Sequence, residues 1–279
     1  MLTAARIRLL VATALVVTGA FAVDALGAGS PAAEGWDATL DYTAVKAPLF
    51  PRVSTLRLRV THSGVVVYNR IVPLPHDCVA DGCRLGSAAG GPAFQLVDFG
   101  STKGPTALIW LWTGGAHCCT VVRAVSIPDG ATAARNFGDP GARLTVLHGQ
   151  RVLLSADDRF AYLFTSYASS GLPTRLWRFR NGRFADVTLM FPEQITADAA
   201  RWWKATGQAR RSQGEARGVF AAWAADTCAL GKKADVRREL AIAVAAGTFS
   251  PPRGEPGGQT GAEYATALQR KLTAWGYCD

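Results

Sequence analysis

The chain has 279 residues, of which 49% are hydrophobic and 18% charged, and its 30 basic and 21 acidic residues give a net charge of +9. A chain of this length and apolar content can bury one large core or two small ones. The basic residues form no dense block interleaved with aromatic residues, so we expect a solvated basic surface and no nucleic-acid binding.

Residues 1–28 are expected to form a signal peptide and a short leader. Arg6 and Arg8 precede an apolar run at 9–17, which is shorter than the roughly 20 residues needed to span a bilayer. Ala20-Phe21-Ala22 then fits the small-x-small rule for signal peptidase. We therefore expect a secreted or otherwise extracytoplasmic protein in an oxidising compartment, with no membrane span after cleavage. A retained anchor is the alternative.

Short apolar runs separated by turn residues predict an antiparallel β-rich domain over residues 29–192. The stretches at 56–60 and 65–72 flank His62-Ser63-Gly64 and predict a hairpin whose arginine face is solvated, and Asn181-Gly182 gives the strongest two-residue turn signal. About ten strands of this length are typical of a sandwich or a degenerate propeller. Further strands are expected at 93–99, 106–113, 120–127, 143–147, 151–155, 160–164, 174–180 and 184–189.

Residues 193–279 are alanine-rich and have helical periodicity, so they are expected to form a helical C-terminal region. Two helices are expected before Gly231 and Gly247, and Thr260 with Glu263 three residues later forms a capping box that opens the last helix. The fold class is therefore predicted to be α+β. The apolar faces of the first two helices comprise Val219, Trp223, Asp226 and Leu230, and Val236, Leu240 and Ala243.

Disulfides are expected in an exported chain with an even number of cysteines, although spacing alone does not fix the pairing. The six candidates are Cys78, Cys83, Cys118, Cys119, Cys228 and Cys278. Cys228 and Cys278 lie near predicted helix ends and are expected to pair, closing a loop of about 50 residues. Cys78 and Cys83 flank a tight loop, and pairing them leaves the adjacent Cys118 and Cys119 to pair with each other. The alternative pairs Cys78 and Cys83 one to one with Cys118 and Cys119. This pairing is disfavoured because neighbouring side chains on a strand point to opposite faces.

The stretch Thr113 to Cys119 reads TGGAHCC and resembles the GGAHCC signature of uncharacterised bacterial exported proteins, some of which are similar to FG-GAP or VCBS-type propeller repeats. Matching stretches at 157–162, 167–177 and 186–192 extend the resemblance over about residues 93–225. The resemblance implies membership of this group but no activity, since fold analogy does not supply one. At 98–104 only Asp98 is acidic and Lys103 carries the opposite charge, so the calcium loop of the better-known repeats is not expected.

Four interpretations of the His117-Cys118-Cys119 motif follow from its chemistry. It could form a mixed nitrogen and sulfur metal site with His76, Cys78 and Cys83, or a redox pair in which His117 lowers the pKa of Cys118. It could form a vicinal disulfide, a flat apolar ring that stacks on a sugar together with Trp110 or Trp112. The fourth interpretation is a structural staple, which the oxidising compartment and the lack of C-x-x-C spacing favour; no cofactor is expected and the metal question stays open.

No catalytic constellation stands out in the sequence. Ser169-Ser170-Gly171 lacks the G-x-S-x-G elbow of serine hydrolases. Asp157 and Asp158 could form a carboxylate pair for acid/base work, but adjacent side chains on a strand diverge, so Asp158-Arg159 is expected to be an exposed turn pair. The stretch at 268–277 resembles, over about ten residues, the first helix of type 1 peptidoglycan-binding domains, and is otherwise an ordinary amphipathic helix.

We therefore expect a non-catalytic exported protein that binds a ligand, a cell-wall polymer or glycan, or another envelope protein. The alternative is an extracytoplasmic thiol-redox or metal-binding protein that uses His117, Cys118 and Cys119. The candidate ligand-binding residues are Trp110, Trp112, His117, Cys118 and Cys119.

Overall fold

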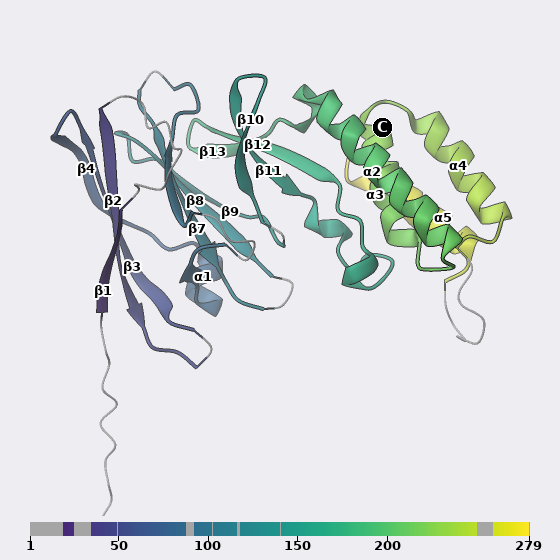
Figure 1. Cartoon of the computed structure of the whole chain (residues 1–279), viewed down its shortest axis with the longest axis horizontal. Coiled ribbons are helices and arrows are strands. Elements are labelled where there is room, and N and C mark those ends of the chain that lie inside the picture. The colour runs from purple at the N-terminus through teal and green to yellow at the C-terminus, as the bar shows by residue number, and fades with distance from the viewer. Residues whose placement is uncertain are drawn as a thin grey trace, which may run out of the picture.

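The computed structural model of the chain describes residues 19–24, 35–48, 50–87, 92–101, 103–115, 118–139, 141–249 and 259–278. The predicted α+β class is confirmed, because three antiparallel sheets form the N-terminal part and a helical region follows (Figure 1). Most of the expected signal peptide, residues 1–18 and 25–28, lies outside the described residues. The described part of that segment, Gly19–Asp24, is strand β1.

Sheet A is a four-stranded antiparallel meander. The hairpin expected around Ser63 and Gly64 is confirmed; both residues have positive φ, 50° and 79°, as a tight two-residue turn between twisted strands requires. Arg57 and Arg59 lie on the exposed face of the sheet as expected. The strands are β1 (Gly19–Asp24), β2 (Trp36–Val45), β3 (Arg52–His62) and β4 (Val65–Val72).

Sheet B is the central layer, and its strands β7 and β8 are buried on both faces. Residues 107–111 of β7 are each at most 3% exposed, which explains why the run TALIWLW is apolar without alternation. A short helix, α1 (His76–Asp81), leads into the sheet. Its strands are β5 (Arg84–Leu85), β6 (Phe94–Val97), β7 (Thr106–Trp112), β8 (Thr120–Ser126) and β9 (Thr132–Asn136).

Sheet C is a second four-stranded meander, and its closing turn at Asn181-Gly182 is the predicted one, with φ of 50° and 73°. The strand expected at 160–164 is wrong. Asp157 instead caps a 3-10 turn, η1 (Asp158–Phe160), and Phe160 is buried among the C-terminal helices. The strands are β10 (Arg143–Leu147), β11 (Gln150–Ala156), β12 (Thr174–Arg180) and β13 (Arg183–Asp186).

The sheets stack face to face, with one apolar core in each interface. Leu58 and Ile109 meet between sheets A and B, and Trp110 and Trp177 meet between sheets B and C. A smaller core containing Leu176 covers the far face of sheet C, where the chain turns into the helices. Meanders packed in this way resemble neighbouring propeller blades, but the described part of the chain has three, fewer than the four or more of a closed propeller.

The helical region is built from four long helices around its own core. The capping box at the start of α5 is confirmed: Thr260 N donates to Glu263 Oε2 at 2.8 Å and Glu263 N donates to Thr260 Oγ1 at 3.3 Å. Within the described residues, none of the helices combines the length and apolar character needed to cross a membrane. The helices are α2 (Pro192–Arg211), α3 (Arg217–Ala229), α4 (Lys233–Ala245) and α5 (Gly261–Ala274).

Candidate functional site

The six cysteines form three bonded pairs in the structure, and none is free. The Cys228–Cys278 pair joins the end of α3 to the segment after α5. The other two pairs are local, since one closes α1 and the other joins two adjacent residues. The bonds are Cys78–Cys83, Cys118–Cys119 and Cys228–Cys278.

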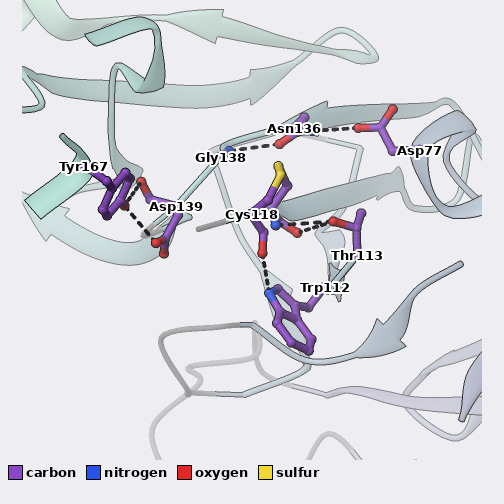
Figure 2. Close-up of a disulfide and its surroundings, with 9 residues drawn as sticks. Asp77, Trp112, Thr113, Cys118, Asn136, Gly138, Asp139 and Tyr167 are labelled. Atoms are coloured by element: carbon purple, nitrogen blue, oxygen red, sulfur yellow. Dashed lines mark hydrogen bonds between the residues drawn. A yellow bond between two sulfur atoms is a disulfide. The ribbon is translucent and has the colours of Figure 1, made fainter. Parts of the chain in front are cut away.

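The Cys118–Cys119 pair closes the loop between β7 and β8, and that loop is hydrogen-bonded back to the end of β7 (Figure 2). Trp112 Nε1 donates to the Cys118 carbonyl at 2.7 Å. Thr113 N donates to the Cys119 carbonyl at 3.1 Å, and Cys119 N donates to Thr113 Oγ1 at 3.3 Å. These bonds satisfy backbone groups that a seven-residue loop would otherwise leave to solvent, so they hold the ring in one position.

The two glycines of the motif are required by the shape of the loop. Gly114 and Gly115 have φ of +93° and +95°, a region that residues with a side chain rarely adopt. A Cβ on Gly114 would also lie 2.8 Å from Cε1 of Phe50. The Gly-Gly sequence is therefore explained by backbone conformation and by the close approach of Phe50.

The candidate ligand-binding residues do not form one exposed surface. Trp110 is 3% exposed, and its Nε1 donates to the Ala142 carbonyl at 2.8 Å in the core between sheets B and C. We therefore assign Trp110 to the core rather than to a ligand surface. The Trp112 ring is contacted by the Arg84 guanidinium, 4.3 Å from its centroid, and by Phe50. Trp112 thus braces the loop, while His117 lies outside the described residues.

The metal site expected as one alternative has no counterpart among the described side chains. In that part of the chain no three histidine, cysteine or carboxylate groups lie close enough together to hold an ion. The sulfur atoms that would have contributed are paired with one another.

The segment 136–139 links the cysteine loop to sheet C. Thr120, the residue after the disulfide, exchanges backbone hydrogen bonds with it: Thr120 N donates to the Gly138 carbonyl and Phe137 N donates to the Thr120 carbonyl. On its far side, Tyr167 donates its hydroxyl to Asp139 Oδ2 at 2.8 Å (Figure 2). The TGGAHCC loop and the loops that follow β11 therefore lie at the same end of the stacked sheets.

Asp157, at the end of β11, is the centre of a buried ionic cluster. Its carboxylate is 5% exposed and accepts hydrogen bonds from Arg159 Nε at 2.8 Å, Arg175 Nη2 at 3.2 Å and the Tyr277 hydroxyl at 2.8 Å. Burial opposes its ionisation, yet the hydrogen bonds from Arg159 and Tyr277 and the charge of Arg175 lower the pKa of Asp157 below its usual value. Asp157 is therefore an ionised structural anchor, and the exposed turn pair expected at Asp158-Arg159 follows it.

Beside this cluster lies a polar cavity of about 320 Å³, which we call the Arg135 pocket. The Arg135 guanidinium lies 3.4 Å from the centroid of the Trp177 ring, and burial lowers its pKa. Burial, reinforced by the charge of Asp157, raises the pKa of Asp158. The pocket is lined by Arg135, Asn136, Phe137, Ser155, Ala156, Asp157, Asp158, Arg159, Arg175, Trp177 and Asp186.

A second buried carboxyl pair fastens α2 and α3 to sheet C. Asp198 Oδ2 accepts a hydrogen bond from Thr174 N at 2.8 Å and another from Trp202 Nε1 at 3.1 Å. Asp226 is 1% exposed, and burial, together with the neighbouring charge of Asp198, raises the pKa of Asp226 to about 9. Asp226 is therefore neutral at physiological pH, in a site that it shares with Asp198.

The sequence singles out Asp157 and Asp226 but not the side chains that surround them. Arg175 and Tyr277 lie 18 and 120 residues from Asp157, so spacing carries no signal for the cluster. Asp226 was placed on the apolar face of its helix, and that position is the one clue to a buried carboxyl.

Comparison with known proteins gives one limited similarity. No protein-family model and no solved structure matches the chain. A probable thylakoid lumen protein of Synechocystis sp. is 35% identical over 92 residues, which cover 30% of this chain and 27% of that protein, so the chain spans less than a third of the relative's length. The lumenal relative and the paired cysteines place the protein outside the cytoplasm.

Proposed function

We propose that this extracytoplasmic protein is a non-catalytic binding protein whose Arg135 pocket takes a neutral, hydroxyl-rich unit, such as one sugar of a cell-envelope glycan. The observation that carries the proposal is the balance of charge in the pocket, which is lined by three arginines and three aspartates. Such a lining has little net charge to attract ions, but it offers fixed hydrogen-bond donors and acceptors to a ligand that carries both kinds of group.

The groups free to contact a ligand are Arg135 and Asp158. Arg135 lines the cavity and stacks on Trp177, and it has no ion pair among the described residues, so its N–H groups are available to a ligand. Asp158 also lines the cavity, where its carboxylate oxygens can accept hydrogen bonds from a ligand. The cavity volume of about 320 Å³ is at the lower end of the roughly 300–1,000 Å³ of small-ligand pockets, which favours one sugar-sized unit.

The same geometry favours binding over catalysis. The lone pairs of Asp157 are occupied by Arg159, Arg175 and Tyr277, and a general base needs a lone pair within reach of a substrate proton. In this proposal the disulfide loop fixes segment 136–139, which forms one wall of the pocket, through Thr120.

The test is a titration of the exported protein with soluble fragments of bacterial cell-wall glycan, followed by NMR and by calorimetry. Arg135→Ala and Asp158→Asn should each weaken binding at least tenfold without unfolding the protein, because both side chains are at the surface. Arg183→Ala is the matched control, since Arg183 is an exposed arginine at the opposite end of sheet C. Equal affinity in all four proteins, or no binding by the unaltered protein, would reject the proposal.

A further inference from the structure

The groove between α4 and α5 differs from the other cavities of the protein. It encloses about 580 Å³, and its lining includes Lys233, Val236 and Arg237 of α4 and Arg270, Leu272 and Ala274 of α5. Three basic residues and no acidic residue contribute to this lining. Each of the three other cavities described for the protein includes at least one carboxylate.

Two of the basic side chains are not neutralised within the protein. Arg237 and Arg270 are exposed, and neither has a hydrogen bond or an ion pair among the described residues. The adjacent Arg238 shows the contrast, since it pairs with Asp235 at 3.0 Å and with Glu239 at 3.4 Å. The two acidic residues of α4 therefore pair with Arg238, and the positive charge of the groove is not neutralised by them.

The floor of the groove is apolar. Val236 and Leu272 lie beneath it and are only 3% and 0% exposed, so the apolar surface within reach of a ligand is that of Ala274 and of the methylene stems of the three basic residues. The Cys228–Cys278 bond closes one end. A purely ionic ligand would leave this floor unused, whereas a purely apolar ligand would desolvate the two arginines without pairing them.

We propose that the α4–α5 groove binds an amphiphilic anion, an aliphatic chain that ends in a carboxylate, as in a free fatty acid. The carboxylate pairs with Arg237 and Arg270, whose planar guanidinium groups match its two oxygens. The aliphatic chain lies along Ala274 and the methylene stems of the basic residues. A second copy of this chain is not the occupant, because the protein carries a net charge of +9 and the groove itself is basic. This site is separate from the Arg135 pocket and does not depend on its ligand.

Calorimetric titration of the full exported chain with decanoate, decanol and inorganic phosphate tests the proposal. Decanoate should bind with one-to-one stoichiometry, and decanol and phosphate should each bind at least tenfold more weakly. Arg237→Gln with Arg270→Gln should lower decanoate affinity at least tenfold. Arg210→Gln with Arg211→Gln, the same change of charge on two exposed arginines of α2, is the control and should leave affinity unchanged.

A variant that fills the groove separates the apolar contribution from the ionic one. Ala274 is exposed and lines the groove, so Ala274→Trp should weaken decanoate binding while circular dichroism and the melting temperature stay close to those of the unaltered protein. Equal binding of decanol and decanoate would overturn the proposal, as would tight binding of phosphate alone. An unchanged affinity in the Arg237/Arg270 variant, or no binding of decanoate at all, would overturn it as well.

Discussion

The hydroxyl of Tyr277 donates a hydrogen bond of 2.8 Å to Oδ2 of Asp157, joining residues 120 positions apart in the sequence. This bond ties the segment after α5 to the end of β11. Phe160 lies beneath it, with ring centroids 5.7 Å from Tyr277 and 5.1 Å from Trp275. The last turn of the chain thus closes the interface between the sheets and the helices.

Replacing Tyr277 by Phe should destabilise the protein without changing its fold. The change keeps the ring and removes the donor, and hydrogen bonds to charged groups contribute about 1.5–3 kcal/mol, so the free energy of unfolding at pH 7 should fall by about that amount. Urea denaturation followed by tryptophan fluorescence measures the change.

The pKa of Asp157 is lowered in the fold, so its stabilising contribution is present above the pKa of an unfolded aspartate and is lost as the pH falls through the folded pKa. Tyr277→Phe should make the free energy of unfolding fall less on acidification than it does in the unaltered protein. An unchanged free energy of unfolding at pH 7 would show that the hydrogen bond does not stabilise the fold.

Replacing Asp226 by Asn should change how stability depends on pH. The pKa of Asp226 is raised to about 9, against about 3.9 for an unfolded aspartate. The folded protein therefore holds an extra proton between these values, and the resulting stabilisation is complete below pH 4 and declines as the pH rises toward 9. The ionisable groups that act on this site are Asp198 and Arg201 of α2, Arg175 of β12 and Tyr277.

The asparagine variant does not titrate, so its free energy of unfolding relative to that of the unaltered protein should increase with pH. We expect a relative gain of about 4 kcal/mol between pH 5 and pH 8, measured by urea denaturation at several pH values. Asp235→Asn, at an exposed acid of α4, should give a curve parallel to that of the unaltered protein. Parallel curves for both variants would mean that Asp226 is already ionised at neutral pH.

Alkylation of the native exported protein should modify no cysteine. All six are paired in the structure, so the intact mass should be that of three disulfides, and a non-reduced digest should yield Cys118 and Cys119 within one peptide. Iodoacetamide labelling followed by mass spectrometry makes the measurement, with a fully reduced sample as the control. Labelling at Cys118 or Cys119 would favour the thiol-redox or metal-binding alternative over the binding protein proposed above.

Replacing Gly114 by Ala should cost more stability than the same change at Gly64. Both glycines have positive φ, +93° and +79°, and a new Cβ at Gly114 meets Phe50 at 2.8 Å whereas nothing lies within 4 Å at Gly64. The conformational penalty of about 1 kcal/mol is common to both positions, so the difference in melting temperature reports the collision with Phe50. Equal losses would show that Phe50 moves aside without cost.

Local signals in the sequence predicted local structure well. The hairpin turn at Ser63-Gly64, the turn at Asn181-Gly182 and the capping box of Thr260 with Glu263 each depend on residues within a few positions of one another. Such signals act through backbone conformation and nearby hydrogen bonds, so one sequence contains all the information that they need.

The errors arose where distant segments determine the environment. Phe160 was assigned to a strand because of its apolar neighbours, but the C-terminal helices bury it, and Asp157 turns the chain before a strand can form. Trp110 was considered a ligand-binding residue because it precedes the TGGAHCC loop, yet sheet C covers it. The polar partners of Asp157 come from β12 and from the C-terminal segment, and no pattern of spacing could have identified them.

The burial of β7 and β8 on both faces affects how the chain folds. Both faces of these strands are covered in the native structure. The apolar sequence of β7 contains no charged residue, which is typical of an aggregation-prone segment. Sheet B therefore cannot persist by itself and becomes stable only when sheets A and C close over it. Any shortened form of the protein that lacks either covering sheet leaves this layer exposed, so the three sheets behave as one cooperative folding unit.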